Sequence, residues 1–122
     1  MIVSVYNRTR GCAVSVGVAV ANTAFARLVG LLGKARSWAE SGGGLWIVPS
    51  QGVHTFGMRF PIDVIFLDAA RRVIDVQDHL RPFRISRLRL NAHSVLEVPP
   101  GTIEKSRTRA GDELEIVSQN SA

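Results

Sequence analysis

The chain has 122 residues, 46% of them hydrophobic and 20% charged, and it carries a formal net charge of +5. Its length fits one domain with its own core, and its apolar content excludes an intrinsically disordered chain. The single cysteine excludes an intrachain disulfide framework and a multi-cysteine zinc site, and the apolar stretches are too short to span a bilayer. We therefore expect one domain over residues 1–122 and, since the first residues lack an export-signal pattern, a cytoplasmic protein.

The first third of the sequence predicts two strands and a helix. Residues 2–6 form a short β-prone run. Residues 12–20 place Cys12 and four valines on one parity, which is typical of a strand with one buried face. An Asn-Thr pair then supplies a side-chain cap for an amphipathic helix over residues 22–33, where apolar side chains recur at i, i+3, i+4 and i+7.

The rest of the sequence predicts a mainly β protein. Five further short strands are expected, at residues 45–48, 62–67, 73–76, 94–98 and 114–117. Residues 62–67 are apolar on both parities, so that strand is expected to be buried on both faces. Many short strands with one helix favour a β-sandwich or a barrel-like sheet, mostly antiparallel.

Three segments resemble a known family. They are RLVGLLG at residues 27–33, GLWIV at 44–48 with HTFGMRFPIDVIFLD at 54–68, and VLEV at 95–98 followed by PGT and GD. In this order and spacing they resemble the prokaryotic family called domain of unknown function 192. The resemblance implies a small β-rich, sandwich-like fold with a helix packed against it. No activity is established for that family, and many of its members carry an export signal, which we do not expect in this chain.

One acidic residue in the middle segment needs an explanation. Asp63 falls inside the strand predicted at 62–67, where an unpaired carboxylate is costly. We expect either a buried ion pair, with Arg59, Arg27 or His54 as the partner, or a carboxylate that caps backbone donors.

The loop over residues 54–63 is the candidate ligand site. Its expected ligand-binding residues are His54, Phe56, Met58, Arg59, Asp63 and Arg27. The planar guanidinium of Arg59 suits a carboxylate or a phosphate. The leading hypothesis is therefore a binding module, without metal or cofactor, that takes a small anionic ligand or a peptide at this loop.

Other functions remain open on the sequence. A hydrolase-type enzyme would use His54 as the base and Asp63 to orient it. An interaction or assembly module would use a strand edge, with a protein as its partner. Nucleic-acid binding is less favoured: residues 81–89 contain four arginines and no acid, but they read first as a solvated loop. Glu97 is expected to point outward from its strand or to pair with an arginine.

Overall fold

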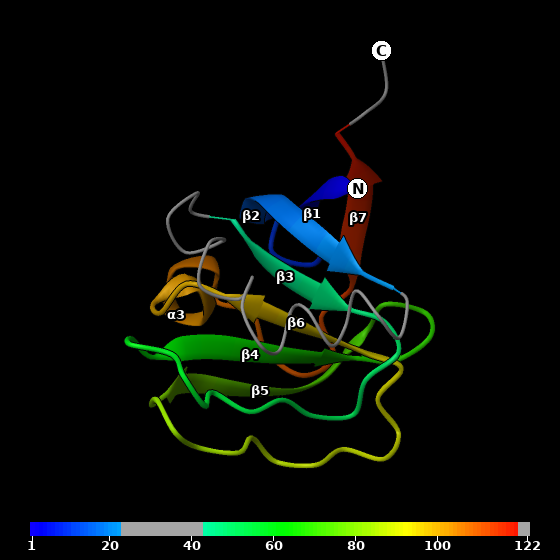
Figure 1. Ribbon diagram of the computed structural model, residues 1–122. Coiled ribbons are helices and arrows are strands. Elements are labelled where there is room, and N and C mark those ends of the chain that lie inside the picture. The colour runs from blue at the N-terminus through cyan, green and yellow to red at the C-terminus, as the bar shows by residue number, and fades with distance from the viewer. Residues whose placement is uncertain (23–42, 120–122) are drawn as a thin grey trace.

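The computed structural model describes residues 1–22 and 43–119 (Figure 1). Apart from its first residue, the helix predicted over residues 22–33 lies outside the described residues, and so does Arg27. Among the described residues, no helix is long and apolar enough to cross a membrane.

Seven strands form one sheet. They are β1 (Ile2–Asn7), β2 (Cys12–Ala21), β3 (Gly44–Ile47), β4 (Ile62–Leu67), β5 (Val73–Leu80), β6 (Ser94–Val98) and β7 (Leu114–Ser118). The order across the sheet is β5-β4-β6-β3-β2-β1-β7, and every neighbouring pair is antiparallel except β2 and β3. The predicted mainly β, mostly antiparallel fold is confirmed, with β5 longer than expected.

The parallel pair requires a long connection between its two strands. Strands that run in the same direction require a crossover of a dozen or more residues, which is usually helical. The connection between β2 and β3 covers residues 22–43, the part of the sequence that carries the amphipathic pattern.

The sheet curls until its two edge strands meet at one end (Figure 1). Three backbone hydrogen bonds join the segments at this end: Val73 N donates to Asp112 O at 2.8 Å, Gly111 N donates to Val73 O at 2.8 Å, and Leu114 N donates to Arg71 O at 3.0 Å. Arg72 and Glu113 thereby face each other as an antiparallel bridge. The fold is therefore one curled, half-closed sheet, which confirms the barrel-like form of the prediction. Closing an edge in this way satisfies backbone groups that an open sheet would expose.

Apolar side chains are buried on both faces of this sheet. One cluster contains Val64, Phe66 and Val95, and the other contains Ile65, Leu67, Leu96 and Val98. All six residues of β4 and all five of β6 are buried. The prediction that β4 is covered on both sides is therefore confirmed.

The alternation expected in β2 is interrupted. Val16, predicted on the buried parity, is 53% exposed, whereas Ser15 is buried. The register between β1 and β2 shifts in this region, and Gly17 has a φ of 77°. A bulge adds one residue to a strand and breaks its period of two, and glycine accepts the left-handed conformation at little cost.

The short helix α3 (Thr102–Ser106) was absent from the sequence prediction. Five residues are too few to show a helical period. Ile103 of α3 packs into the cluster that includes Leu96 and Val98.

A buried polar network joins the β1–β2 turn to the segment before β7. The Asn7 amide donates to Thr108 Oγ1 at 3.0 Å and to Asp112 Oδ2 at 2.9 Å, and Arg10 Nε donates to Asp112 Oδ2 at 3.1 Å. Burial alone would raise the pKa of Asp112. Hydrogen bonds from Asn7, Arg10 and the Arg109 backbone outweigh it and lower that pKa below its usual 3.8.

We expect the substitution Asp112→Asn to lower the free energy of unfolding at neutral pH by about 1–3 kcal/mol, because it replaces the carboxylate that accepts hydrogen bonds from Asn7, Arg10 and the Arg109 backbone. Because the pKa of Asp112 is lower in the folded than in the unfolded chain, its ionisation stabilises the folded state at pH values above the unfolded pKa. This stabilisation is lost as the pH falls through the pKa of Asp112 in the folded state. Urea unfolding should therefore show a smaller loss of stability below about pH 4 in the variant than in the native chain. The control is Glu115→Gln, which changes an exposed carboxylate. If Asp112→Asn lost as much unfolding free energy on acidification as this control, the lowered pKa of Asp112 would be contradicted.

Candidate functional site

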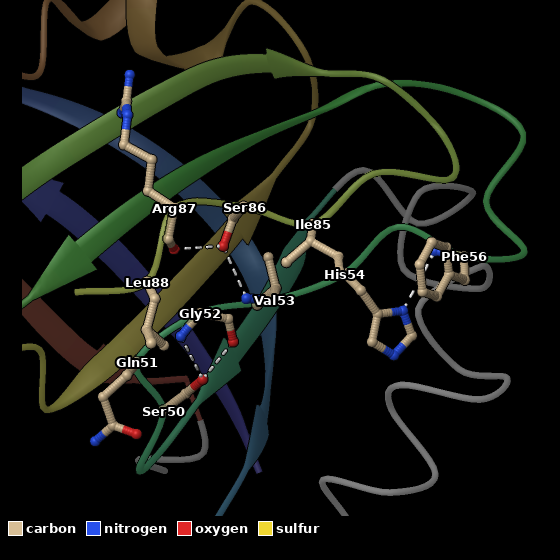
Figure 2. Close-up of a pocket in the computed structure, with 10 residues that line it drawn as sticks. All are labelled: Ser50, Gln51, Gly52, Val53, His54, Phe56, Ile85, Ser86, Arg87 and Leu88. Atoms are coloured by element: carbon tan, nitrogen blue, oxygen red, sulfur yellow. Dashed lines mark hydrogen bonds between the residues drawn. The ribbon is translucent and has the colours of Figure 1, made fainter. Parts of the chain in front are cut away.

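Two segments expected to be loops pair with each other and form a surface ribbon, defined here as residues 50–56 and 83–89. Its backbone hydrogen bonds are Ser86 N to Val53 O, Thr55 N to Arg84 O and Arg89 N to Gln51 O, each 2.9 Å long. His54 and Ile85 face each other as an isolated antiparallel bridge. Figure 2 shows the two segments side by side.

A hollow of about 380 Å³ lies along this ribbon, within the range of roughly 300–1,000 Å³ that is common for ligand pockets. It is lined by residues 50–54, Phe56 and residues 85–88 (Figure 2). Three of the lining side chains are apolar and exposed: Phe56 at 51%, Ile85 at 71% and Leu88 at 68%. Exposed apolar side chains gathered around a concavity are characteristic of binding surfaces.

His54 and Phe56 are fixed relative to each other at one end of the hollow. Their rings stack with centroids 5.0 Å apart, and the Phe56 N–H donates to His54 Nδ1 at 3.3 Å. Met58 N donates to Thr55 O at 3.1 Å, and Gly57 between them has a φ of 83°. These values fit a type II turn, in which the third position favours glycine and Phe56 is carried at the tip.

Other predicted ligand residues lie apart from the hollow. Met58 is 5% exposed and belongs to the core cluster of Val64 and Phe66. Arg59 is exposed and forms no hydrogen bond or ion pair with another described residue. Of the six predicted residues, the structure therefore brings His54 and Phe56 together at the hollow.

Asp63 is held by backbone groups. Its Oδ1 accepts a hydrogen bond from His79 N–H and its Oδ2 accepts one from Ile103 N–H, both at 2.9 Å. The expectation of an ion pair with Arg59 or His54 is wrong, and the alternative of a carboxylate that caps backbone donors is confirmed. Within the described residues, Asp63 ties β4 to the end of β5 and to α3, and it does not orient His54.

Thr55, which was not singled out in the sequence, anchors the ribbon. It is fully buried, and its hydroxyl donates to Arg81 O at 2.6 Å and accepts from Arg84 N at 2.9 Å. Its carbonyl also accepts from Phe83 N at 3.1 Å. The partners are 26 to 29 residues away, so only the tertiary structure reveals this role.

The arginines of residues 81–89 fall into two pairs. Arg87 Nη1 donates to Asp75 Oδ2 at 3.2 Å and to Val76 O at 3.1 Å, and Arg89 Nε lies 3.7 Å from the same carboxylate. These contacts hold the ribbon against the outer edge of β5. Arg81 and Arg84 have no carboxylate partner among the described residues, and both are exposed.

Glu97 is buried rather than outward-facing, and it forms no ion pair with an arginine of the described part of the chain. It lies between Val64 and Leu45 in the sheet and is 2% exposed, and its Oε2 has no hydrogen-bond partner in the described part of the chain. Burial raises the pKa of Glu97 from 4.5 to about 8. At neutral pH its carboxyl group is therefore mostly protonated.

We expect Thr55→Val, which keeps the side-chain shape but removes the hydroxyl, to loosen the ribbon. The Arg84 N–H and the Arg81 carbonyl would lose a partner, at a cost of about 1–3 kcal/mol in unfolding free energy. Hydrogen exchange should show faster exchange at the amides of Arg84 and Ser86. The matched control is Thr9→Val on the exposed β1–β2 turn; equal protection of the ribbon in both variants would contradict the role of Thr55.

We expect Glu97→Gln to change the pH dependence of stability. A raised pKa means that the folded protein keeps a proton that the unfolded chain releases. Between pH 4.5 and about 8 this removes up to ~1.4 kcal/mol of unfolding free energy per pH unit. Urea unfolding at about pH 5, 7 and 9 should show that the free energy of unfolding of the variant increases relative to that of the native chain as pH rises. Glu115→Gln should show no such relative increase. A difference in unfolding free energy between Glu97→Gln and the native chain that stays constant with pH would refute the raised pKa of Glu97.

Comparison with known proteins places this fold in a family. The family model DUF192, described as "Uncharacterized ACR", matches residues 5–116. A UPF0127 protein of Thermococcus sibiricus is 33% identical over 124 residues, covering 95% of this chain and 77% of its own length. A UPF0127 protein of Pyrococcus horikoshii is 33% identical over 102 residues, covering 80% of this chain and 84% of its own.

A solved structure has the same fold. The crystal structure of a protein of unknown function from Novosphingobium aromaticivorans matches with a TM-score of 0.73 and 22% identity, over 94% of this chain and 84% of that one. The family match runs from β1 to β7 and includes all three motif segments of the sequence. The chain belongs to DUF192, a family of uncharacterised function.

Proposed function

We propose that this protein is a binding module that captures an acidic peptide segment along the ribbon, with an apolar side chain of the peptide in the hollow. The observation that carries the proposal is the hollow of about 380 Å³ bordered by the exposed side chains of Phe56, Ile85 and Leu88. Burying apolar surface of this kind stabilises a complex by about 25 cal/mol per Å² before the costs of association.

Charge favours an acidic partner. The chain carries a net charge of +5, and residues 81–89 contain four arginines and no acid. Arg84 in the ribbon and Arg59, three residues after Phe56 in the chain, are exposed and free of ion pairs among the described residues. A guanidinium in this state is available to a carboxylate of the ligand.

The geometry favours this function over the other candidates. A hydrolase built on His54 and Asp63 lacks support, because both oxygens of Asp63 accept backbone N–H groups. Strand-edge assembly at β5 is disfavoured, because Arg87 occupies the edge carbonyl of Val76. A small anion alone would leave the apolar side chains of the hollow uncovered, which is why we favour a peptide.

A cytoplasmic location is part of this proposal. The single cysteine is compatible with a reducing compartment, where disulfide scaffolds are rare. Fractionation of host cells with antibody detection tests it, and recovery of the protein outside the cytoplasm would contradict it.

The binding test uses a random peptide library displayed on phage and selected against the immobilised full chain. We expect enriched peptides that combine apolar residues with Asp or Glu. The Kd of an enriched peptide, measured by fluorescence anisotropy, should rise about tenfold or more in the double variant Ile85→Ser/Leu88→Ser. Arg59→Ala should weaken the same peptide, with a smaller dependence of Kd on salt.

The control is Val16→Ser/Val117→Ser, which removes two exposed apolar side chains from β2 and β7, away from the ribbon. It should leave the Kd unchanged. Selection of peptides without acidic residues, or equal binding by both double variants, would overturn the proposal.

A further inference from the structure

The turn at the end of the ribbon presents an aromatic side chain to solvent under strain. Phe83 has a φ of 60° and is 63% exposed. A bulky residue in the left-handed region costs roughly 1–2 kcal/mol, and an exposed phenyl ring offers no burial in return. The fold of the isolated chain therefore gives no reason for phenylalanine at this position.

The same turn is held in one conformation. The Phe83 N–H donates to the Thr55 carbonyl, and the Thr55 hydroxyl binds the backbones of Arg81 and Arg84 on either side. Thr55 is fully buried, so these bonds are shielded from water. A turn whose backbone is ordered before binding loses less entropy on association, which favours its use as a recognition element.

The positive charge beside Phe83 restricts the kind of partner surface that its side chain can bind. Arg81 and Arg84 flank Phe83, and neither has an acidic partner among the described residues. A second copy of this chain would bring the same arginines face to face, which costs free energy. A partner with acidic side chains around an apolar pocket would match both the ring and its flanks.

We infer that residues 81–84 form a docking tip, in which Phe83 inserts into an apolar pocket on a partner protein while Arg81 and Arg84 pair with acidic residues at the rim. The tip shares Arg84 with the proposed peptide site, but Phe83 does not line the hollow. The two surfaces are therefore tested separately through Phe83 on one side and Ile85 and Leu88 on the other.

The first test asks whether Phe83 serves the fold. Asparagine tolerates the left-handed conformation, so Phe83→Asn should leave the Tm unchanged or raise it. A clear drop in Tm would show that the ring stabilises the isolated chain, and the inference would fail.

The second test places the photo-crosslinker p-benzoylphenylalanine at position 83 of the full chain, in extract of the native host. We expect a discrete adduct whose crosslinked peptide, mapped by mass spectrometry, lies at an apolar surface rimmed by Asp or Glu. With the purified partner, Phe83→Asn should raise the Kd about tenfold or more. Ile85→Ser/Leu88→Ser should have a smaller effect on this Kd, which separates the tip from the peptide site.

The crosslinker at position 6, in place of the exposed aromatic Tyr6, is the control and should not give the same adduct. The charge-reversed variant Arg81→Glu/Arg84→Glu should lose the adduct, while Arg8→Glu/Lys105→Glu should keep it. The inference is overturned by an adduct only with a second copy of this chain, by a crosslink to a surface without acidic residues, or by no adduct. Phe83-dependent sedimentation with vesicles that contain phosphatidylserine, in the absence of a protein adduct, would assign the tip to a lipid surface instead.

Discussion

The burial of β4 and β6 on both faces is the constraint from which most of this structure follows. A strand without a solvent-exposed face needs a hydrogen-bond partner within the protein for each of its polar side chains. Asp63 accepts two backbone N–H groups, and Ser94 accepts a hydrogen bond from the indole of Trp46 at 2.9 Å. Oε2 of Glu97 has no hydrogen-bond partner among the described residues, and burial raises the pKa of this carboxyl group to about 8. Two carboxyl groups in adjacent buried strands therefore have different environments, because backbone donors reach Asp63 and none of the described donors reaches Glu97 Oε2.

The exposed surface of the ribbon depends on how residues 83–89 attach to the edge of this sheet. The outer edge of β5 is covered by residues 83–89, which Arg87 attaches to Asp75 and to the Val76 carbonyl. With that segment in place, Thr55 can bind the turn at residues 81–84. These bonds fix the backbone of segments without regular secondary structure, on which apolar and basic side chains are exposed. Such segments carry binding residues when a stable scaffold positions them.

The candidate site was only partly predictable. His54 and Phe56 were selected because an aromatic residue and a titratable residue lay beside a buried strand, and the structure places both at the hollow. Met58 belongs to the core instead, because the turn at Gly57 reverses the chain between it and Phe56. Ile85 and Leu88 could not be found, since their proximity to residues 50–56 depends on hydrogen bonds between segments about 30 residues apart.

The sequence by itself determined the strands, since a period of two or a continuous apolar run is a local property of the chain. It also determined family membership and the double burial of β4. Only the tertiary structure decided that the strands form one curled sheet, that a bulge turns Val16 outward, and that Asp63 binds backbone rather than arginine. These outcomes depend on which distant backbone donors and acceptors meet when the edges of the sheet close, and no pattern within a single segment contains that information.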